Sequence, residues 1–150
     1  MPYSELGDKL SVGFEEFDDD HAKLLALINE LRDSLQTGNA KEVLGRVLAG
    51  LTVYTGFHFA HEEELLLWTK YPKYAAHRRE HEAFAGAIEE LHRDFHKRAS
   101  DALPYEVLEF LENWLFEHSL GADRAAAEYL KAHLDVLESH AGAAGHPQAA

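Results

Sequence analysis

The stretch YTGFHFAHEEELL (residues 54–66) decides the fold, because it joins an apolar helical stripe to two residue types that bind metals. His58 and Glu62 lie four residues apart, and this spacing places both side chains on one face of a helix. The same face carries apolar residues at positions 43, 47, 51 and 65, so we predict that it points into a core. An unpaired buried polar group costs roughly 1–3 kcal/mol, and metal coordination is the simplest compensation for both side chains.

Three further groups of the same residue types occur along the chain: His21 alone, His77 with His81, and His118 with Asp123. Each group falls on its own predicted helix. His118 and Asp123 are five residues apart, which a regular helix places on diverging faces, so we expect Gly121 to let the chain leave helical geometry. Five histidines and two carboxylates over-supply a single ion, and carboxylates can bridge cations, so the set predicts two metal ions.

Helical spacing of apolar residues predicts four long helices, over about 18–37, 40–69, 73–98 and 104–120, and a shorter one over 124–137. We expect residues 1–17 to form an extended arm, Asp18–Asp20 to cap the first helix, and residues 138–150 to be a flexible tail. Pro104 suits the first turn of the fourth helix. The predicted fold is all-α: an up-down-up-down four-helix bundle with an N-terminal arm and a short C-terminal helix, one domain over residues 1–137.

Composition restricts the partners and the kind of site. The formal net charge of −13 disfavours nucleic acid and anionic membranes as partners. The absence of cysteine excludes disulfides and thiolate metal sites, and histidine with carboxylate suits iron, manganese or zinc. The N-terminus has no apolar signal-peptide core, and no stretch approaches the ~20 apolar residues of a membrane span. We therefore expect a cytoplasmic protein.

The order of the site residues resembles the hemerythrin family, specifically its bacterial single-domain members. The resemblance rests on FDDDHAKL (17–24), YTGFHFAHEEELL (54–66), YPKYAAHRREHEAF (71–84) and WLFEHSLGAD (114–123). It implies two iron ions in a non-haem centre bridged by an oxo or hydroxo group. By this resemblance, one iron has the ligands His77, His81 and His118, the other has His21 and His58, and Glu62 and Asp123 bridge them. The domain over 1–137 is then a hemerythrin-like di-iron domain.

The resemblance also implies a function, which is reversible two-electron reduction of dioxygen for oxygen carriage, storage or sensing. It places dioxygen on the two-histidine iron, in an apolar pocket that matches Leu24, Phe59, Trp114 and Leu115. The family usually has isoleucine directly after the fourth-helix histidine, and this chain has Ser119. Our hypothesis is that the smaller hydroxyl side chain widens and wets the pocket. Faster autoxidation, or easier access for peroxide and small anions, would follow.

Three other functions use the same residues. The centre of a di-iron enzyme would turn over peroxide, oxygen or nitric oxide, but ferritin-like catalysts use paired Glu-x-x-His motifs, and only Glu89 with His92 has that spacing here. An oxygen or iron sensor would signal to a partner, and a structural zinc bundle would be colourless. We predict surface or boundary positions for the six remaining histidines, and a solvated face for Glu63 and Glu64: the histidines are His61, His92, His96, His133, His140 and His146.

Overall fold

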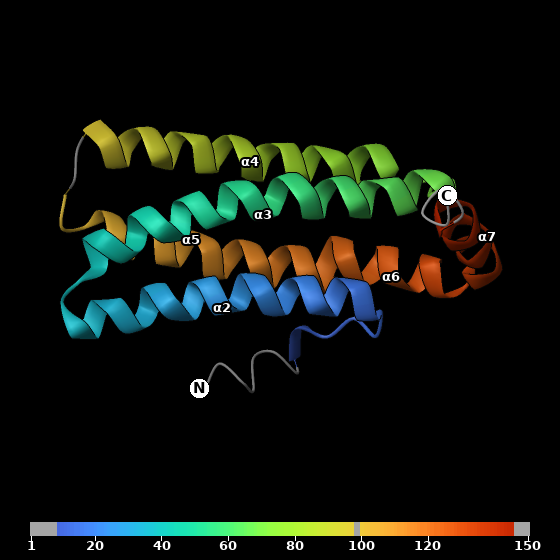
Figure 1. Ribbon diagram of the computed structural model, residues 1–150, viewed down its shortest axis with the longest axis horizontal. Coiled ribbons are helices and arrows are strands. Elements are labelled where there is room, and N and C mark those ends of the chain that lie inside the picture. Colours follow the sequence, from blue (N-terminus) through green and yellow to red (C-terminus); the bar gives the residue numbers. More distant parts are fainter. Residues whose placement is uncertain (1–8, 98–99, 146–150) are drawn as a thin grey trace.

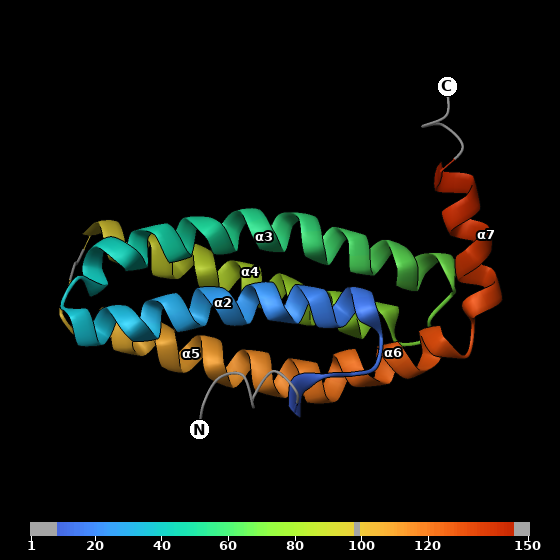
Figure 2. The same ribbon diagram turned by 60° about the horizontal axis from the view of Figure 1, so that its bottom comes forward.

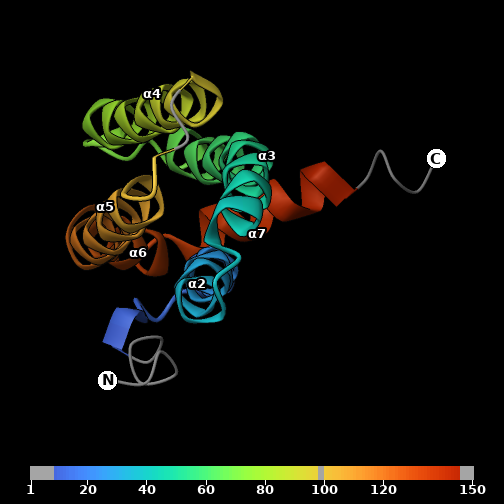
Figure 3. The ribbon, with the colours of Figure 1, turned by 90° about the vertical axis from the view of Figure 1, so that its left-hand side faces the viewer.

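Four long helices lie side by side and alternate in direction, with short connections between them (Figure 1). The computed structural model describes residues 9–97 and 100–145. Its four long helices are α2 (Glu15–Thr37), α3 (Ala40–Trp68), α4 (Tyr74–Lys97) and α5 (Leu103–His118). Viewed from one end, they occupy the corners of a bundle in the cyclic order α2, α3, α4, α5 (Figure 3). The predicted all-α bundle is confirmed.

The core consists of two apolar clusters that lie at different heights along the bundle. The larger cluster includes Leu24, Phe59, Phe84 and Leu115, and the smaller includes Phe17, Leu65 and Ala126. Along α2, α3 and α4, the predicted metal-binding residues lie between residues of the larger cluster and residues that belong to the smaller cluster or pack against it. His118 and Asp123 lie in the chain between Leu115 of the larger cluster and Ala126 of the smaller one. The fold therefore holds a polar layer between two apolar layers, which keeps water away from both sides of the histidines.

The first long helix begins at Glu15, so the prediction that Asp18–Asp20 cap it was wrong. The residue at the cap position is Phe14, whose side chain makes no capping hydrogen bond. Asp18 instead accepts hydrogen bonds from the backbone N–H of Val12 (2.8 Å) and the hydroxyl of Ser11 (2.9 Å). The acidic run is therefore inside the helix, where Asp18 holds the preceding arm against the bundle.

The fourth long helix continues into a π-helical segment, η1 (Ser119–Asp123). A π-helix bonds residues five apart, so it brings His118 and Asp123 onto one side of the chain, whereas α-helical geometry would separate them. The sequence predicted a departure from helical geometry at Gly121, and the structure identifies its form. Ser119 and Asp123 are both buried, so the widened turn faces inward.

Two helices follow where one was predicted over 124–137. They are α6 (Arg124–Lys131) and α7 (Leu134–Gly145), and the backbone turns between them at Ala132 and His133. α7 then projects away from the four-helix bundle (Figure 2). The expected flexible tail over 138–150 is helical through Gly145, and its residues 146–150 lie outside the described part.

α3 is long and apolar enough to cross a membrane by length and composition, but only weakly so. It lies within the bundle, where it packs against both α2 and α4. Its buried positions include His58 and Glu62, and its outer face exposes Val53 and Phe57. The high apolar content of α3 thus comes from its buried core positions together with apolar residues exposed on its outer face.

Two glycines allow a test of how the first helix ends. Gly38 has φ of 84°, in the left-handed region, and donates its N–H to the carbonyl of Ser34 at 3.0 Å. A Cβ at Gly38 would meet no atom within 4 Å, so Gly38→Ala costs backbone strain alone, about 1–2 kcal/mol. The matched control is Gly86→Ala inside α4, which is equally free of contacts and should stabilise by about 0.5–1 kcal/mol. Urea unfolding of both variants checks the prediction, and a shift of the same sign in both would contradict it.

Candidate metal centre

All seven predicted ligands lie in the polar layer and are buried. Five of them offer ligand atoms that lie within 4.8 Å of one another: Glu62, His77, His81, His118 and Asp123. The other two adjoin this set directly. Nε2 of His58 lies 3.1 Å from Oε2 of Glu62, and Nε2 of His21 lies 2.6 Å from Oδ2 of Asp123. Residues from α2, α3, α4, α5 and η1 thus meet in one small volume.

The two carboxylates each divide their oxygens between the same two groups of histidines. Oε1 of Glu62 faces Nε2 of His77 and of His81, while its Oε2 faces His58. Oδ1 of Asp123 lies 3.2 Å from Nε2 of His77 and 3.0 Å from Nε2 of His118, while its Oδ2 faces His21. One side of the layer therefore has three imidazoles and the other has two, and both carboxylates span the two sides.

Several of these atoms approach one another without hydrogen-bond geometry. Nε2 of His81, Nε2 of His118, Oε2 of Glu62 and Oδ1 of Asp123 are buried and make no hydrogen bond, although contacts of 3.0–3.2 Å join them to neighbouring ligand atoms. A buried polar atom without a partner costs about 1–3 kcal/mol. Imidazole nitrogens and carboxylate oxygens aimed at shared points are the donor set for hard or borderline metal ions. The residues therefore fit a pair of iron ions.

The carboxylates of this layer raise the pKa values of two histidines, His77 and His118. Burial lowers the pKa of His77, but the close contacts with the carboxylates of Asp123 and Glu62 outweigh burial and raise that pKa to about 9. Burial likewise lowers the pKa of His118, and its contacts with the carboxylates of Asp123 and Glu80 raise that pKa to about 10. In the metal-free protein both imidazoles are thus protonated at neutral pH.

The pKa values of the two carboxylates, Glu62 and Asp123, are lowered. Burial and the neighbouring Asp123 raise the pKa of Glu62, but close contacts with three imidazoles outweigh them and lower it to about 2. The pKa of Asp123 is also held well below its usual value, since contacts with the imidazoles of His118, His21 and His77 overcome the effect of burial. In the metal-free protein the protonated imidazoles and the ionised carboxylates therefore stabilise one another.

The aromatic members of the predicted oxygen pocket lie against the three-histidine side. Phe59 stacks on His81 with ring centroids 3.8 Å apart, and Trp114 stacks on His118 at 4.3 Å. Leu24 and Leu115 are buried in the larger apolar cluster. Ser119 is fully buried, and its hydroxyl lies 3.3 Å from Nε2 of His21, on the two-histidine side.

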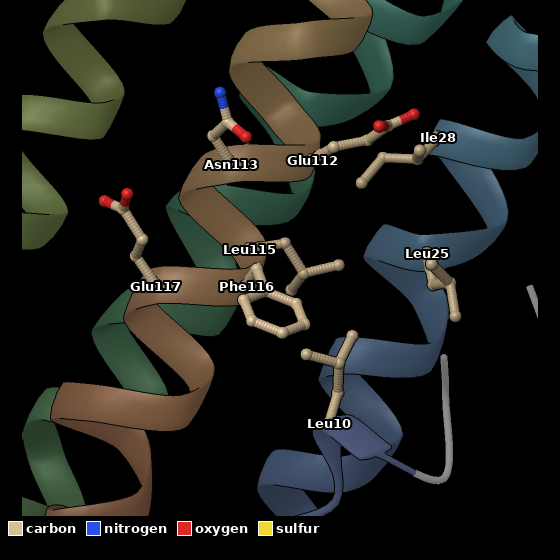
Figure 4. A pocket seen from close by; sticks show the side chains of 8 residues that line it. All are labelled: Leu10, Leu25, Ile28, Glu112, Asn113, Leu115, Phe116 and Glu117. Atoms are coloured by element: carbon tan, nitrogen blue, oxygen red, sulfur yellow. The ribbon is translucent and has the colours of Figure 1, made fainter. Parts of the chain in front are cut away.

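A separate hollow of about 260 Å³ lies between α2, α5 and the arm (Figure 4). Leu115 and Phe116 enter it from α5, Leu25 lines it from α2, and Leu10 lines it from the arm. The rest of its lining is Ile28, Glu112, Asn113 and Glu117. None of the seven predicted ligands lines it, so this hollow is distinct from the metal centre.

Three carboxylates next to the histidines escaped the sequence analysis. Glu63, predicted to be solvated, accepts a hydrogen bond from Nδ1 of His81 at 2.8 Å. Glu80 accepts one from Nδ1 of His118 at 3.1 Å. Asp20, predicted to cap a helix, is in ion-pair contact with Nδ1 of His58. A signal was present, because each carboxylate is the immediate chain neighbour of a predicted ligand.

The remaining histidines lie away from the metal centre where the structure describes them. His61 is exposed and pairs with Glu16 at 2.9 Å, as expected for a surface residue. His92 is half-buried beside Thr52, and His96 is exposed. His133 is half-buried and stacks on Tyr129. The predictions for the side chains of His140 and His146 fall outside the described residues.

Comparison with known proteins identifies the family. The family description "Hemerythrin HHE cation binding domain" matches residues 12–130, which include all seven predicted ligands. The chain belongs to the hemerythrin family. It is 36% identical to a bacteriohemerythrin of Stenotrophomonas maltophilia over 128 residues, which cover 85% of this chain and 82% of the relative. It is 31% identical to a bacteriohemerythrin of Methylococcus capsulatus over 122 residues, which cover 81% of this chain and 90% of the relative.

Solved structures support the same conclusion for the fold. A crystal structure of a hemerythrin variant superposes with a TM-score of 0.69 at 27% identity, covering 78% of this chain and 88% of that one. Hemerythrins bind dioxygen at a non-haem di-iron centre, and the buried cluster of this chain has the corresponding donor set. The predicted family, fold and dioxygen binding at a di-iron centre are confirmed.

The shifted pKa values predict how the stability of metal-free hemerythrin depends on pH. The raised pKa values of His77 and His118 contribute stability that is complete below their ordinary value of 6.5 and is lost as pH rises through about 9 and 10. The lowered pKa of Glu62 contributes stability that is complete above its ordinary value of 4.5 and is lost toward about 2. Chelator-treated protein should therefore be less stable at pH 10 than at pH 6.5.

Chemical denaturation across this pH range measures the effect. Iron-loaded protein is the control, because an imidazole nitrogen that binds a metal carries no proton, and this form should lose less stability on the alkaline side. A metal-free protein whose free energy of unfolding stays constant between pH 6.5 and 10 would contradict the prediction.

Proposed function

We propose that this hemerythrin carries, stores or senses dioxygen by binding it reversibly. In this proposal His77, His81 and His118 would hold one iron and His21 and His58 the other, and Glu62 and Asp123 would serve both. The supporting observation is that Glu62 and Asp123 each present one oxygen to the three-histidine side and one to the two-histidine side. When bound, the iron pair supplies two electrons to dioxygen and recovers them on release.

The unequal number of histidines supports binding of dioxygen on the side of His21 and His58. With one imidazole fewer, that side has room for an added ligand. Leu24, one helical turn from His21, and the buried Leu115 would line the space, together with Phe59, whose ring centroid lies 5.7 Å from that of His58. Trp114 instead covers His118 on the three-histidine side. An apolar lining slows the access of water and protons, which would favour reversible binding over oxidation of the centre.

Hemerythrins are oxygen-binding proteins, and we extend this to propose binding in preference to turnover for this chain. Ferritin-like di-iron catalysts build their sites from a carboxylate-rich set with paired Glu-x-x-His motifs. Here five histidines share two carboxylates, and His92, the only partner of Glu89 at that spacing, lies beside Thr52 outside the centre. A cytoplasmic location stays a prediction from the sequence.

An optical spectrum through reduction with dithionite, exposure to air and deoxygenation tests the function. Reversible binding predicts that bands of the bridged di-iron centre appear with air and disappear on deoxygenation. His58→Ala and His118→Ala should abolish this cycle, because each removes one ligand. His61→Ala is the matched control, since His61 lies on α3 beside the site but is exposed and pairs with Glu16. A cycle that survives loss of His58 or His118 would refute the ligand assignment.

Ser119 carries the second prediction about this function. Its hydroxyl lies beside Nε2 of His21, so we propose that it admits water, peroxide or small anions to the two-histidine side. Ser119→Ala removes the hydroxyl without added bulk, and Ser119→Ile adds the apolar volume usual in the family. Both variants should autoxidise more slowly than the wild type, as followed by decay of the oxygenated spectrum. Equal rates in all three proteins would remove the idea.

A further inference from the structure

Three of the five histidines have a carboxylate on the side opposite to the proposed iron. Glu63 accepts a hydrogen bond from Nδ1 of His81, and Glu80 accepts one from Nδ1 of His118. Asp20 is in ion-pair contact with Nδ1 of His58. In every pair Nε2 faces a bridging carboxylate and Nδ1 faces a second one. Each ring thus has a carboxylate near both of its nitrogens.

These pairs follow a single order around the bundle. Asp20 of α2 contacts His58 of α3, and Glu63 of α3 contacts His81 of α4. Glu80 of α4 contacts His118 of α5. Asp123, in η1 after α5, contacts His21 of α2 and closes the cycle. The cyclic order of the four helices in the end view matches this sequence (Figure 3). Every long helix thus has a carboxylate, on itself or in its π-helical extension, that contacts one proposed ligand histidine of the next helix.

The arrangement repeats in the sequence as well. Asp20 precedes His21, Glu63 follows Glu62, and Glu80 precedes His81. Adjacent residues on an α-helix point about 100° apart, so one of the two reaches the centre and the other reaches toward the neighbouring helix. Each helix thereby contributes to the proposed site and also fixes a proposed ligand on the helix beside it.

We propose that Asp20, Glu63 and Glu80 are positioning residues, each of which orients one histidine so that its Nε2 faces iron. This inference rests on the proposed ligand assignment. A carboxylate at Nδ1 selects the tautomer with a free Nε2, and it makes the imidazole a stronger electron donor. Stronger donors favour ferric over ferrous iron, so the three carboxylates lower the reduction potential and slow the loss of iron.

Burial sets the order of the expected effects. The side chains of Asp20 and Glu63 are 16% and 20% exposed, whereas that of Glu80 is 50% exposed. Solvent screens an exposed charge, so Glu80 should contribute least to the potential. Hollows of about 370 Å³ and 250 Å³ reach Glu63 with His81 and Glu80 with His77. Loss of the Glu63 carboxylate would leave His81 facing the larger hollow. Loss of the Glu80 carboxylate would leave His77, a neighbour of His118, facing the smaller one.

The test uses the iron-loaded full chain with Asp20→Asn, Glu63→Gln and Glu80→Gln, which keep side-chain size and remove the charge. Glu90→Gln is the matched control, because Glu90 also lies on α4 but is exposed on the surface. Three readouts apply: the reduction potential, the rate of iron loss to a chelator, and the solvent-exchangeable Nδ1–H proton resonances shifted by the paramagnetic iron. Unfolding of the metal-free variants measures any purely structural effect.

We expect iron affinity to fall about 10–100-fold in Asp20→Asn and Glu63→Gln, and less in Glu80→Gln. The reduction potential should rise, and each variant should move one exchangeable resonance, while the control matches the wild type. If Asp20→Asn fails to load iron, Asp20→Glu should restore loading by restoring the charge. A failure of this rescue overturns the proposal for Asp20.

Other outcomes separate this inference from the proposed function. If the wild type shows the reversible spectrum but all three variants keep its potential, iron-loss rate and resonances, the positioning role is wrong and the function stands. Variants that lose only metal-free stability also overturn it, because the carboxylates would then act as helix cross-links alone. If the wild type itself binds no iron, the proposed function fails first, and the inference fails with it.

Discussion

Two buried carboxylates place the strongest constraint on this structure. Glu62 and Asp123 are almost fully removed from water in the middle of the bundle. Burial of an ionised carboxylate is very costly unless it is paired, and here five imidazoles surround the two. The helices must therefore hold those imidazoles in register, and the apolar clusters above and below keep water from replacing them. The same arrangement that solves this electrostatic problem without metal is also a ready set of ligands.

The π-helical segment follows from that constraint. His118 must stay at the end of α5, and Asp123 must return to the same layer five residues later. An α-helix closes a turn in 3.6 residues, whereas i→i+5 bonding aligns residues at this spacing. Such segments are rare and are commonly retained at functional sites. Gly121 has no neighbour within 4 Å of a Cβ position, so its role is not to avoid a clash, and the cluster itself stabilises the widened turn.

Much of this could be predicted from the sequence, because helical periodicity is a strong signal. The spacing of His58 with Glu62 and of His77 with His81 predicted shared helix faces, and both pairs meet in the polar layer. The failures arose where local chemistry was ambiguous. An aspartate run suits a helix N-terminus, but Asp18 and Asp20 lie inside α2. Asp18 contacts Val12 of the arm, and Asp20 contacts His58 of α3. From the sequence alone, a glutamate next to a metal ligand is expected to face solvent. Only the position of α4 shows that Glu63 contacts His81.

The two sides of the centre differ in what covers them, and this bears on how a reversible oxygen site can work. Aromatic rings stack on His81 and His118, and Tyr54 stacks on His58 of the two-histidine side with ring centroids 5.1 Å apart. His21, also on that side, has the small side chain of Ser119 beside its Nε2. The two-histidine side therefore combines one imidazole packed against an aromatic ring with one that faces a small hydroxyl group. We infer that room for an added ligand lies beside His21 rather than beside His58.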